Sequence, residues 1–188
     1  MKIHAIQTGT VALTRSWREG VGHGKRRLLN TLFDREWTEP LPIYAFAIEH
    51  PEGVIVVDTG ETARVGDPTT IELEAAPVGP FPQSLRLTKA GDVTVVPAAG
   101  HTPGQVAVLL EEHDHTVFIG GDTSYTEEAM LRGRADGVGF DEAAELLTHE
   151  RIRAYAADRP TVYLVAHDPD TPARLAERRF VFDRAVAA

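Results

Sequence analysis

Hydrophobic and polar positions alternate in short runs along much of the chain, and this period of two predicts β-strands. Residues 3–7 alternate in this way, and Gly9 is expected to make a turn before the next apolar run at 11–13. Apolar runs at 43–48 and 54–57 flank a glycine-containing turn, which predicts a hairpin. Further strands are expected at residues 93–96, 106–110, 116–119 and 161–166.

The spacing of apolar residues changes to a helical period at a few places in the second half of the chain. It predicts helices over residues 126–131, 140–157 and 171–179. On the longest of them, Phe140, Ala144, Leu147 and Ala154 share one face.

Two segments show little periodicity. Residues 14–40 are rich in arginine and glycine and are expected to form a long loop or flap. We expect its apolar residues to anchor the loop or an oligomer interface, in preference to contacting an acyl chain; they are Trp17, Leu28, Leu29 and Phe33. Residues 61–90, with four prolines, are expected to be an irregular connection within a single domain spanning residues 1–188.

Composition narrows the possible chemistry. The chain of 188 residues has the length of one domain, and it has no cysteine, which excludes disulfides, thiolate metal sites and a cysteine nucleophile. Its formal net charge of −9 argues against nucleic-acid binding, which depends on basic surfaces. With eight histidines, any transition metal would be held by imidazole and carboxylate groups.

Several other classes find no support in the sequence. No apolar run approaches the ~18 residues that a membrane span requires, and no targeting segment is evident, so we expect a cytoplasmic protein without membrane contact. No glycine-rich phosphate loop follows a strand, which argues against a nucleotide cofactor. Ser124 does not lie in a Gly-x-Ser-x-Gly turn, so a serine hydrolase is not indicated.

Four polar side chains follow predicted strands, each beside a small residue or a turn: Asp58, His101, Asp122 and His167. Taken singly, an aspartate there is more often a turn or helix cap, and a histidine is more often a hydrogen-bonded residue than a ligand. Four such motifs in this order are much less expected by chance. Because open sheets bind ligands beyond their strand ends, two imidazoles and two carboxylates make a plausible metal site.

The motifs Asp-Thr-Gly at 58–60, Gly-His-Thr-Pro-Gly at 100–104, Gly-Asp-Thr-Ser-Tyr at 121–125 and His-Asp at 167–168 occur in this order. This order resembles the metallo-β-lactamase fold superfamily, and within it the N-acyl-homoserine lactonase-like branch. The resemblance implies an α/β (α+β) fold, an αββα sandwich in which two mixed β-sheets are flanked by helices. It also places a metal centre at one edge of the sandwich.

The resemblance further implies a role for each residue. His101 corresponds to a ligand of a first metal ion, Asp122 to a carboxylate bridging two ions, and His167 to the last ligand of the second ion. Tyr125 corresponds to the tyrosine that orients or polarises the substrate carbonyl, and Asp58 to an aspartate that supports the metal-binding loop.

The implied activity is zinc-dependent hydrolysis. A metal-activated hydroxide would open N-acyl-homoserine or similar lactones, a quorum-quenching reaction on a small-molecule ester or lactone. A homodimer is possible.

One departure from the family pattern is large. The motif His-x-His-x-Asp-His should follow Asp-Thr-Gly after a helix and a strand, and the chain reads as though that block had been deleted near Thr70–Ile71. The tripeptide His113-Asp114-His115 is not followed by the required aspartate and histidine, so it is expected to be a solvated hairpin tip.

Three interpretations remain open at this stage. The chain could hold one Zn²⁺ or Fe²⁺ ion through His101, Asp122 and His167, with water in the open position. It could be a metal-deficient, catalytically inactive relative that acts as a binding module. The sequence could also omit a segment of an active hydrolase, in which case the Cα distance between Thr70 and Ile71 would greatly exceed 3.80 Å.

Overall fold

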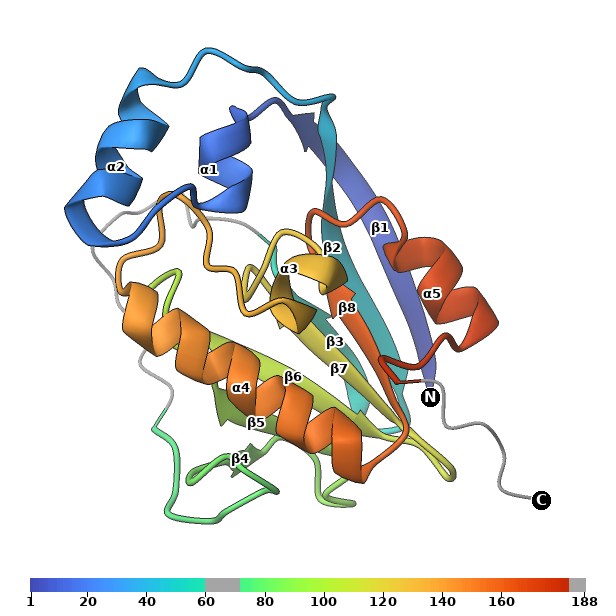
Figure 1. The fold of residues 1–188 in the computed structure, drawn as a ribbon. Coiled ribbons are helices and arrows are strands. Elements are labelled where there is room, and N and C mark those ends of the chain that lie inside the picture. The colour runs from blue at the N-terminus through green and yellow to red at the C-terminus, as the bar shows by residue number, and fades with distance from the viewer. Residues whose placement is uncertain (60–71, 183–188) are drawn as a thin grey trace.

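The computed structural model describes residues 1–59 and 72–182, and within them two β-sheets pack face to face (Figure 1). The strands are β1 (Lys2–Val11), β2 (Leu41–His50), β3 (Gly53–Val57), β4 (Leu85–Arg86), β5 (Val93–Pro97), β6 (Val106–Glu111), β7 (Thr116–Gly121) and β8 (Thr161–Val165). The helices are α1 (Arg15–Glu19), α2 (Gly24–Phe33), α3 (Glu127–Leu131), α4 (Glu142–Asp158) and α5 (Thr171–Glu177). Two sheets with flanking helices confirm the expected fold class.

One sheet has the order β1-β2-β3 and the other β4-β5-β6-β7-β8. All neighbouring strands are antiparallel except β7 and β8, which are parallel and are joined through α3 and α4. The predicted hairpin is confirmed as β2 and β3. The predicted turn at Gly9 is wrong, because β1 continues through it with a register shift between Gln7 and Gly9 that absorbs the irregularity.

The five-stranded sheet is buried on both faces, because successive residues of its strands enter different cores. Phe118 and Tyr163 pack under α4, whereas Ile119 and Leu164 pack against the three-stranded sheet. A large apolar side chain buried in this way contributes roughly 1.5–3 kcal/mol. The two cores therefore fix the strand ends that carry the candidate site.

The helix α4 begins after Asp141, whose carboxylate accepts hydrogen bonds from the backbone N–H groups of Ala143 and Ala144. The face singled out from the sequence is not the buried one, since Phe140 is 75% exposed and Leu147 is 45% exposed. The buried positions of the helix are instead Glu145, Thr148, His149, Ile152, Tyr155 and Ala156. Half of this face is polar, and a hydrophobic period cannot reveal a polar face.

The expected loop at 14–40 is also wrong in part, because the segment contains α1 and α2. Three of the expected apolar anchors do not anchor it, since Leu28 is 53% exposed, Leu29 54% and Phe33 73%, whereas Trp17 does contact the rest of the protein through a hydrogen bond to Tyr125. Polar residues provide further anchors. Arg27 is buried and donates hydrogen bonds to the carbonyls of Asp136 and Gly139, and Thr31 donates to the carbonyl of Gly137.

The tip of the β6–β7 hairpin is less solvated than expected. His115 is 6% exposed, its ring centroid lies 5.8 Å from that of Phe180, and its Nδ1 lies 2.7 Å from Asp114 Oδ1. The inferred deletion at Thr70–Ile71, and residues 61–71 of the connection predicted at 61–90, lie outside the described residues; the described remainder of the connection contains the short strand β4. No helix among the described residues is long and apolar enough to cross a membrane.

Candidate functional site

The parallel pairing of β7 and β8 brings two of the predicted residues together. Gly121 at the end of β7 lies opposite Val165 at the end of β8. Asp122 follows the first strand directly and His167 follows the second after one residue, so both emerge at the same sheet edge. Asp122 Oδ1 lies 3.1 Å from His167 Nε2. This pair is the centre of the candidate site.

The imidazole of His167 is held in place from the opposite sheet. Its Nδ1 lies 2.9 Å from the carbonyl oxygen of Pro42 in β2, and the backbone N–H of Tyr44 donates to the carbonyl of Ala166 at 2.9 Å. Because the carbonyl can only accept, Nδ1 carries a proton, and Nε2 is the nitrogen that faces the carboxylate of Asp122. His167 thus presents a metal-binding nitrogen toward Asp122.

His101 is presented in the same way from the loop after β5. Its Nδ1 lies 2.8 Å from Asp136 Oδ2, so this carboxylate accepts the Nδ1 proton and Nε2 is again the free nitrogen. The loop sits tightly on α4, because a Cβ at Gly100, where φ is +152°, would collide with the backbone of Glu145. Only glycine fits this position.

Asp136 was missed by the sequence analysis. It is 3% exposed, and its Oδ1 accepts the backbone N–H groups of Val138 at 2.7 Å and of Gly139. An aspartate followed by glycines at 137 and 139 is a local signal for such a turn. The contact with His101 spans 35 positions of the chain, and no local pattern predicts it.

Asp58 lies beside the Asp122 turn in a constrained backbone. Its φ is +60°, and its Oδ2 is buried without a hydrogen-bond partner among the described residues. A Cβ at Gly121 would lie 3.2 Å from that oxygen, so the carboxylate packs directly on the turn that carries Asp122. Burial, together with the charge of Asp122, raises the pKa of Asp58 to about 6.

The pKa values of His101, Asp122 and His167 all shift toward the charged form of each group. The hydrogen bond to Asp136 raises the pKa of His101. Burial by itself would lower the pKa of His167, but the adjacent Asp122 outweighs burial and raises it. Burial opposes ionisation of Asp122 in turn, and the imidazole of His167 overcomes this and lowers its pKa. Asp122 is therefore held as a carboxylate.

Tyr125 closes the site on the side of α1. Its ring centroid lies 5.3 Å from that of His167, and its hydroxyl oxygen accepts a hydrogen bond of 3.0 Å from Nε1 of Trp17. Burial raises the pKa of Tyr125, so the hydroxyl keeps its proton at neutral pH. Because the indole can only donate, that proton is free to be given to another acceptor.

The donor types of the site fit a divalent metal ion. Metal-binding histidines commonly donate their second N–H to a carboxylate or carbonyl, as His101 and His167 do here. Asp122 Oδ1 and Asp58 Oδ2 are buried without well-aligned hydrogen bonds. However, within residues 1–59 and 72–182 no three such side chains converge closely enough to form a complete ligand group. A ligand set drawn from the described residues alone would therefore be incomplete.

No family model matches the chain, and no curated protein matches it. Solved structures do share its fold. An N-acyl homoserine lactone hydrolase, with the product N-hexanoyl-L-homoserine at its catalytic metal centre, has a TM-score of 0.65 and 15% identity, covering 92% of this chain and 95% of that one. A probable metal-dependent hydrolase from Staphylococcus aureus has a TM-score of 0.63 and 11% identity, covering 89% of each chain.

A dizinc quorum-quenching lactonase in complex with a product has a TM-score of 0.60 and 11% identity, covering 89% of this chain and 87% of that one. These likenesses establish the metallo-β-lactamase-like fold, as expected from the sequence motifs. At such low identities they establish the fold alone.

Proposed function

We propose that this protein is a metal-dependent hydrolase that opens lactones or similar esters, as its structural neighbours do. One observation carries the proposal. Two histidines from different loops each have Nδ1 bonded to an acceptor, which turns Nε2 toward the site, and Nε2 of His167 faces a half-buried carboxylate at the end of a neighbouring strand. This arrangement orients the two imidazoles in the way that metal-binding histidines are oriented.

His101, Asp122 and His167 are the ligands that the described residues would contribute to the ion, although they do not converge into a complete group in this structure, and Asp58 would support the turn that carries Asp122. When bound, a Zn²⁺ or Fe²⁺ ion would supply Lewis-acid activation of water and of the ester carbonyl. Tyr125 would orient the substrate, since its hydroxyl proton can be donated to the carbonyl oxygen while Trp17 holds the hydroxyl in position. We extend to this chain the quorum-quenching lactone hydrolysis for which one of these neighbours is named.

The proposal is tested by metal content and turnover measured on the same samples. Purified protein is supplied with zinc, dialysed and analysed for metal, then assayed with homoserine lactones of several acyl-chain lengths. We expect about one equivalent of metal in the wild type and a large loss in His101→Ala and His167→Ala. His113→Ala, an exposed histidine at the hairpin tip, is the matched control.

A second candidate function is a metal-free binding module, and the incomplete ligand group among the described residues favours it. The same samples distinguish the two. A folded wild type that retains less than a tenth of an equivalent of metal, unchanged by His101→Ala, and that hydrolyses no lactone would contradict the hydrolase and support the binding module.

A further inference from the structure

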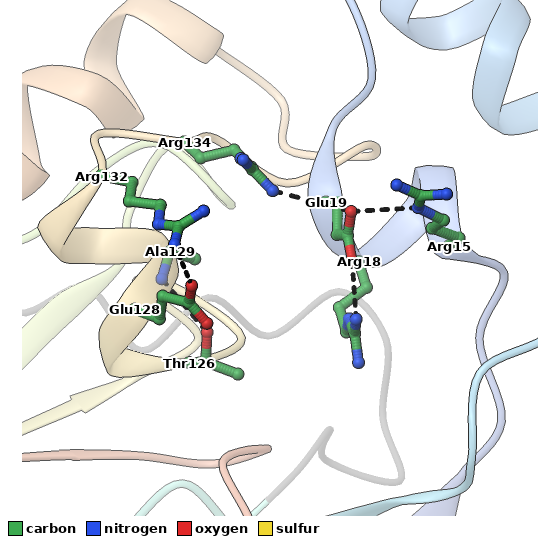
Figure 2. A pocket seen from close by; sticks show the side chains of 8 residues that line it. All are labelled: Arg15, Arg18, Glu19, Thr126, Glu128, Ala129, Arg132 and Arg134. Atoms are coloured by element: carbon green, nitrogen blue, oxygen red, sulfur yellow. Dashed lines mark hydrogen bonds and ion pairs between the residues drawn. The ribbon is translucent and has the colours of Figure 1, made fainter.

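A cavity of about 400 Å³ lies between α1 and residues 126–134, which include α3, and it is lined by charged side chains (Figure 2). Its lining includes four arginines and two glutamates, which are Arg15, Arg18, Glu19, Glu128, Arg132 and Arg134. The residues come from two parts of the chain that are far apart in sequence. None of them belongs to the candidate metal site.

Glu19 organises three of the guanidinium groups. Its carboxylate lies 2.7 Å from NH2 of Arg18, 3.2 Å from Nε of Arg15 and 3.6 Å from NH1 of Arg134, which reaches it from the opposite wall. Each guanidinium carries five N–H donors, so one shared carboxylate satisfies only a few of them. These three arginines are thus oriented with donors to spare, whereas Arg132 is paired with Glu128 at 2.7 Å.

The charge of this cavity is opposite to that of the molecule. Four arginines against two glutamates give the lining a formal charge of +2, whereas the whole chain carries −9. Arg15 also lies 3.6 Å from Glu36, which is outside the cavity lining. A concentration of arginines in an acidic surface attracts anions and favours groups that accept two parallel hydrogen bonds.

We propose that this cavity binds a dianionic phosphoryl group, either inorganic phosphate or a phosphate monoester, through the guanidinium donors of Arg18 and Arg134 that Glu19 leaves unsatisfied. Its charge is opposite to the net positive charge of the lining, and its tetrahedral oxygens can accept from guanidinium groups of both walls. Arg18 follows Trp17 in the chain and Thr126 of the cavity follows Tyr125, and the indole and the phenol are hydrogen-bonded. A bound phosphoryl group would therefore brace the two segments that position Tyr125.

The proposal is tested by titrating phosphate at constant ionic strength into protein dialysed against a chelator, with heat measured by calorimetry. We expect saturable binding that weakens at least about tenfold in Arg18→Gln and in Arg134→Gln, because each removes a charge-assisted contact. Arg159→Gln is the matched control, since this arginine is 48% exposed and paired with Glu111 at 2.7 Å, remote from the cavity. His101→Ala must also bind normally, which separates this site from the metal centre.

Parallel titrations identify the ligand class. If an alkyl phosphate binds as well as inorganic phosphate, the ligand is a phosphate monoester. If inorganic phosphate binds and the alkyl phosphate does not, the ligand is the free ion. Acetate that competes equally well at the same ionic strength would overturn the proposal, as would the absence of saturation at about 10 mM phosphate. Should a glutamine variant not fold, phosphate-dependent shifts of the Arg18 and Arg134 Nε–H resonances in the wild type decide the question.

Discussion

At the scale of single residues, the contact between Asp136 and His101 determines which nitrogen of the imidazole is available. The carboxylate can only accept, so it fixes the proton on Nδ1 and leaves Nε2 free. The same carboxylate is held by two backbone N–H groups, so its position is set by its own turn. Control of the candidate ligand therefore lies in a residue that would not itself bind metal.

Asp136→Asn tests this control with almost no change in shape. The amide oxygen can keep the two backbone contacts, so the amide N–H group faces Nδ1 and stabilises the opposite tautomer of His101. We expect zinc affinity to fall about 10–100-fold. Zinc titration measures the loss, and ¹⁵N chemical shifts of the imidazole report the tautomer. Asp114→Asn, at the exposed hairpin turn, is the control; an unchanged tautomer in Asp136→Asn would contradict the argument.

At the scale of elements, α4 departs most from a simple amphipathic helix. Glu145 on its buried face is 1% exposed, and its Oε1 accepts the backbone N–H of Asp136 at 2.8 Å. Its Oε2 has no hydrogen-bond partner among the described residues. Burial, together with the charge of Asp136, raises the pKa of Glu145 to about 7. A helix whose core face holds a carboxylate of this kind makes stability depend on pH.

The sign of that dependence follows from the raised pKa. Below about pH 4.5 the carboxyl is protonated in both the folded and the unfolded chain, and above it the unfolded chain loses its proton first. The free energy of unfolding should therefore fall by about 3 kcal/mol as pH rises from about 4.5 to about 7, and change little above that. Glu145→Gln should remove this decline in urea titrations with chelator, whereas Glu150→Gln, exposed on the same helix, should retain it. A decline of equal size in both variants would refute the assignment.

The buried residue of α2 is Arg27, which links the helix to residues 136–139. Arg27→Met keeps the length of the side chain but leaves the carbonyls of Asp136 and Gly139 without their donors. We expect a loss of about 2–4 kcal/mol in stability. Faster amide hydrogen exchange should appear in α2 and at residues 134–140. Arg26→Met, exposed on the same helix, is the control, and equal exchange in the two variants would count against this role.

The sequence predicted most strands because their side chains face a core on one side or on both. It also placed Asp122 and His167 at strand ends, and the parallel pairing of β7 and β8 brings them to 3.1 Å. It failed where polar contacts between distant segments decide the structure. The anchoring of α2 by Arg27 and the support of His101 by Asp136 both depend on partners that hydrophobic periodicity does not encode.

At the scale of the whole molecule, the candidate site lies where the two sheets meet. His167 follows a strand of the five-stranded sheet and is fixed by Pro42 of the three-stranded sheet. The far face of that smaller sheet exposes Ile6, Val54 and Val56, at 49%, 68% and 53%. The position of His167 therefore depends on how the two sheets pack against each other. The outer face of the smaller sheet, by contrast, leaves apolar side chains exposed to solvent.

Whether the protein forms the homodimer considered from the sequence can be tested on the exposed side of α2. Leu32 is 74% exposed and Phe33 is 73% exposed, which is unusual for large apolar residues on one helix. If this side pairs two copies, sedimentation velocity should detect an association that weakens in Leu32→Gln and Phe33→Gln. Val54→Gln, on the far face of the three-stranded sheet, should leave it unchanged. Monomers at all concentrations would argue against the dimer.

The parallel pairing of β7 and β8 has a kinetic consequence. The hairpin of β6 and β7 can form locally, but β8 reaches β7 only after the chain has passed through α3 and α4. Closing so long a connection lowers the entropy of the chain before the contacts between β7 and β8 can stabilise it, so this pairing is expected late in folding. Asp122 and His167 would then meet only near the end, and zinc uptake during refolding would lag behind the gain of secondary structure. The candidate site would serve as a reporter of completed folding.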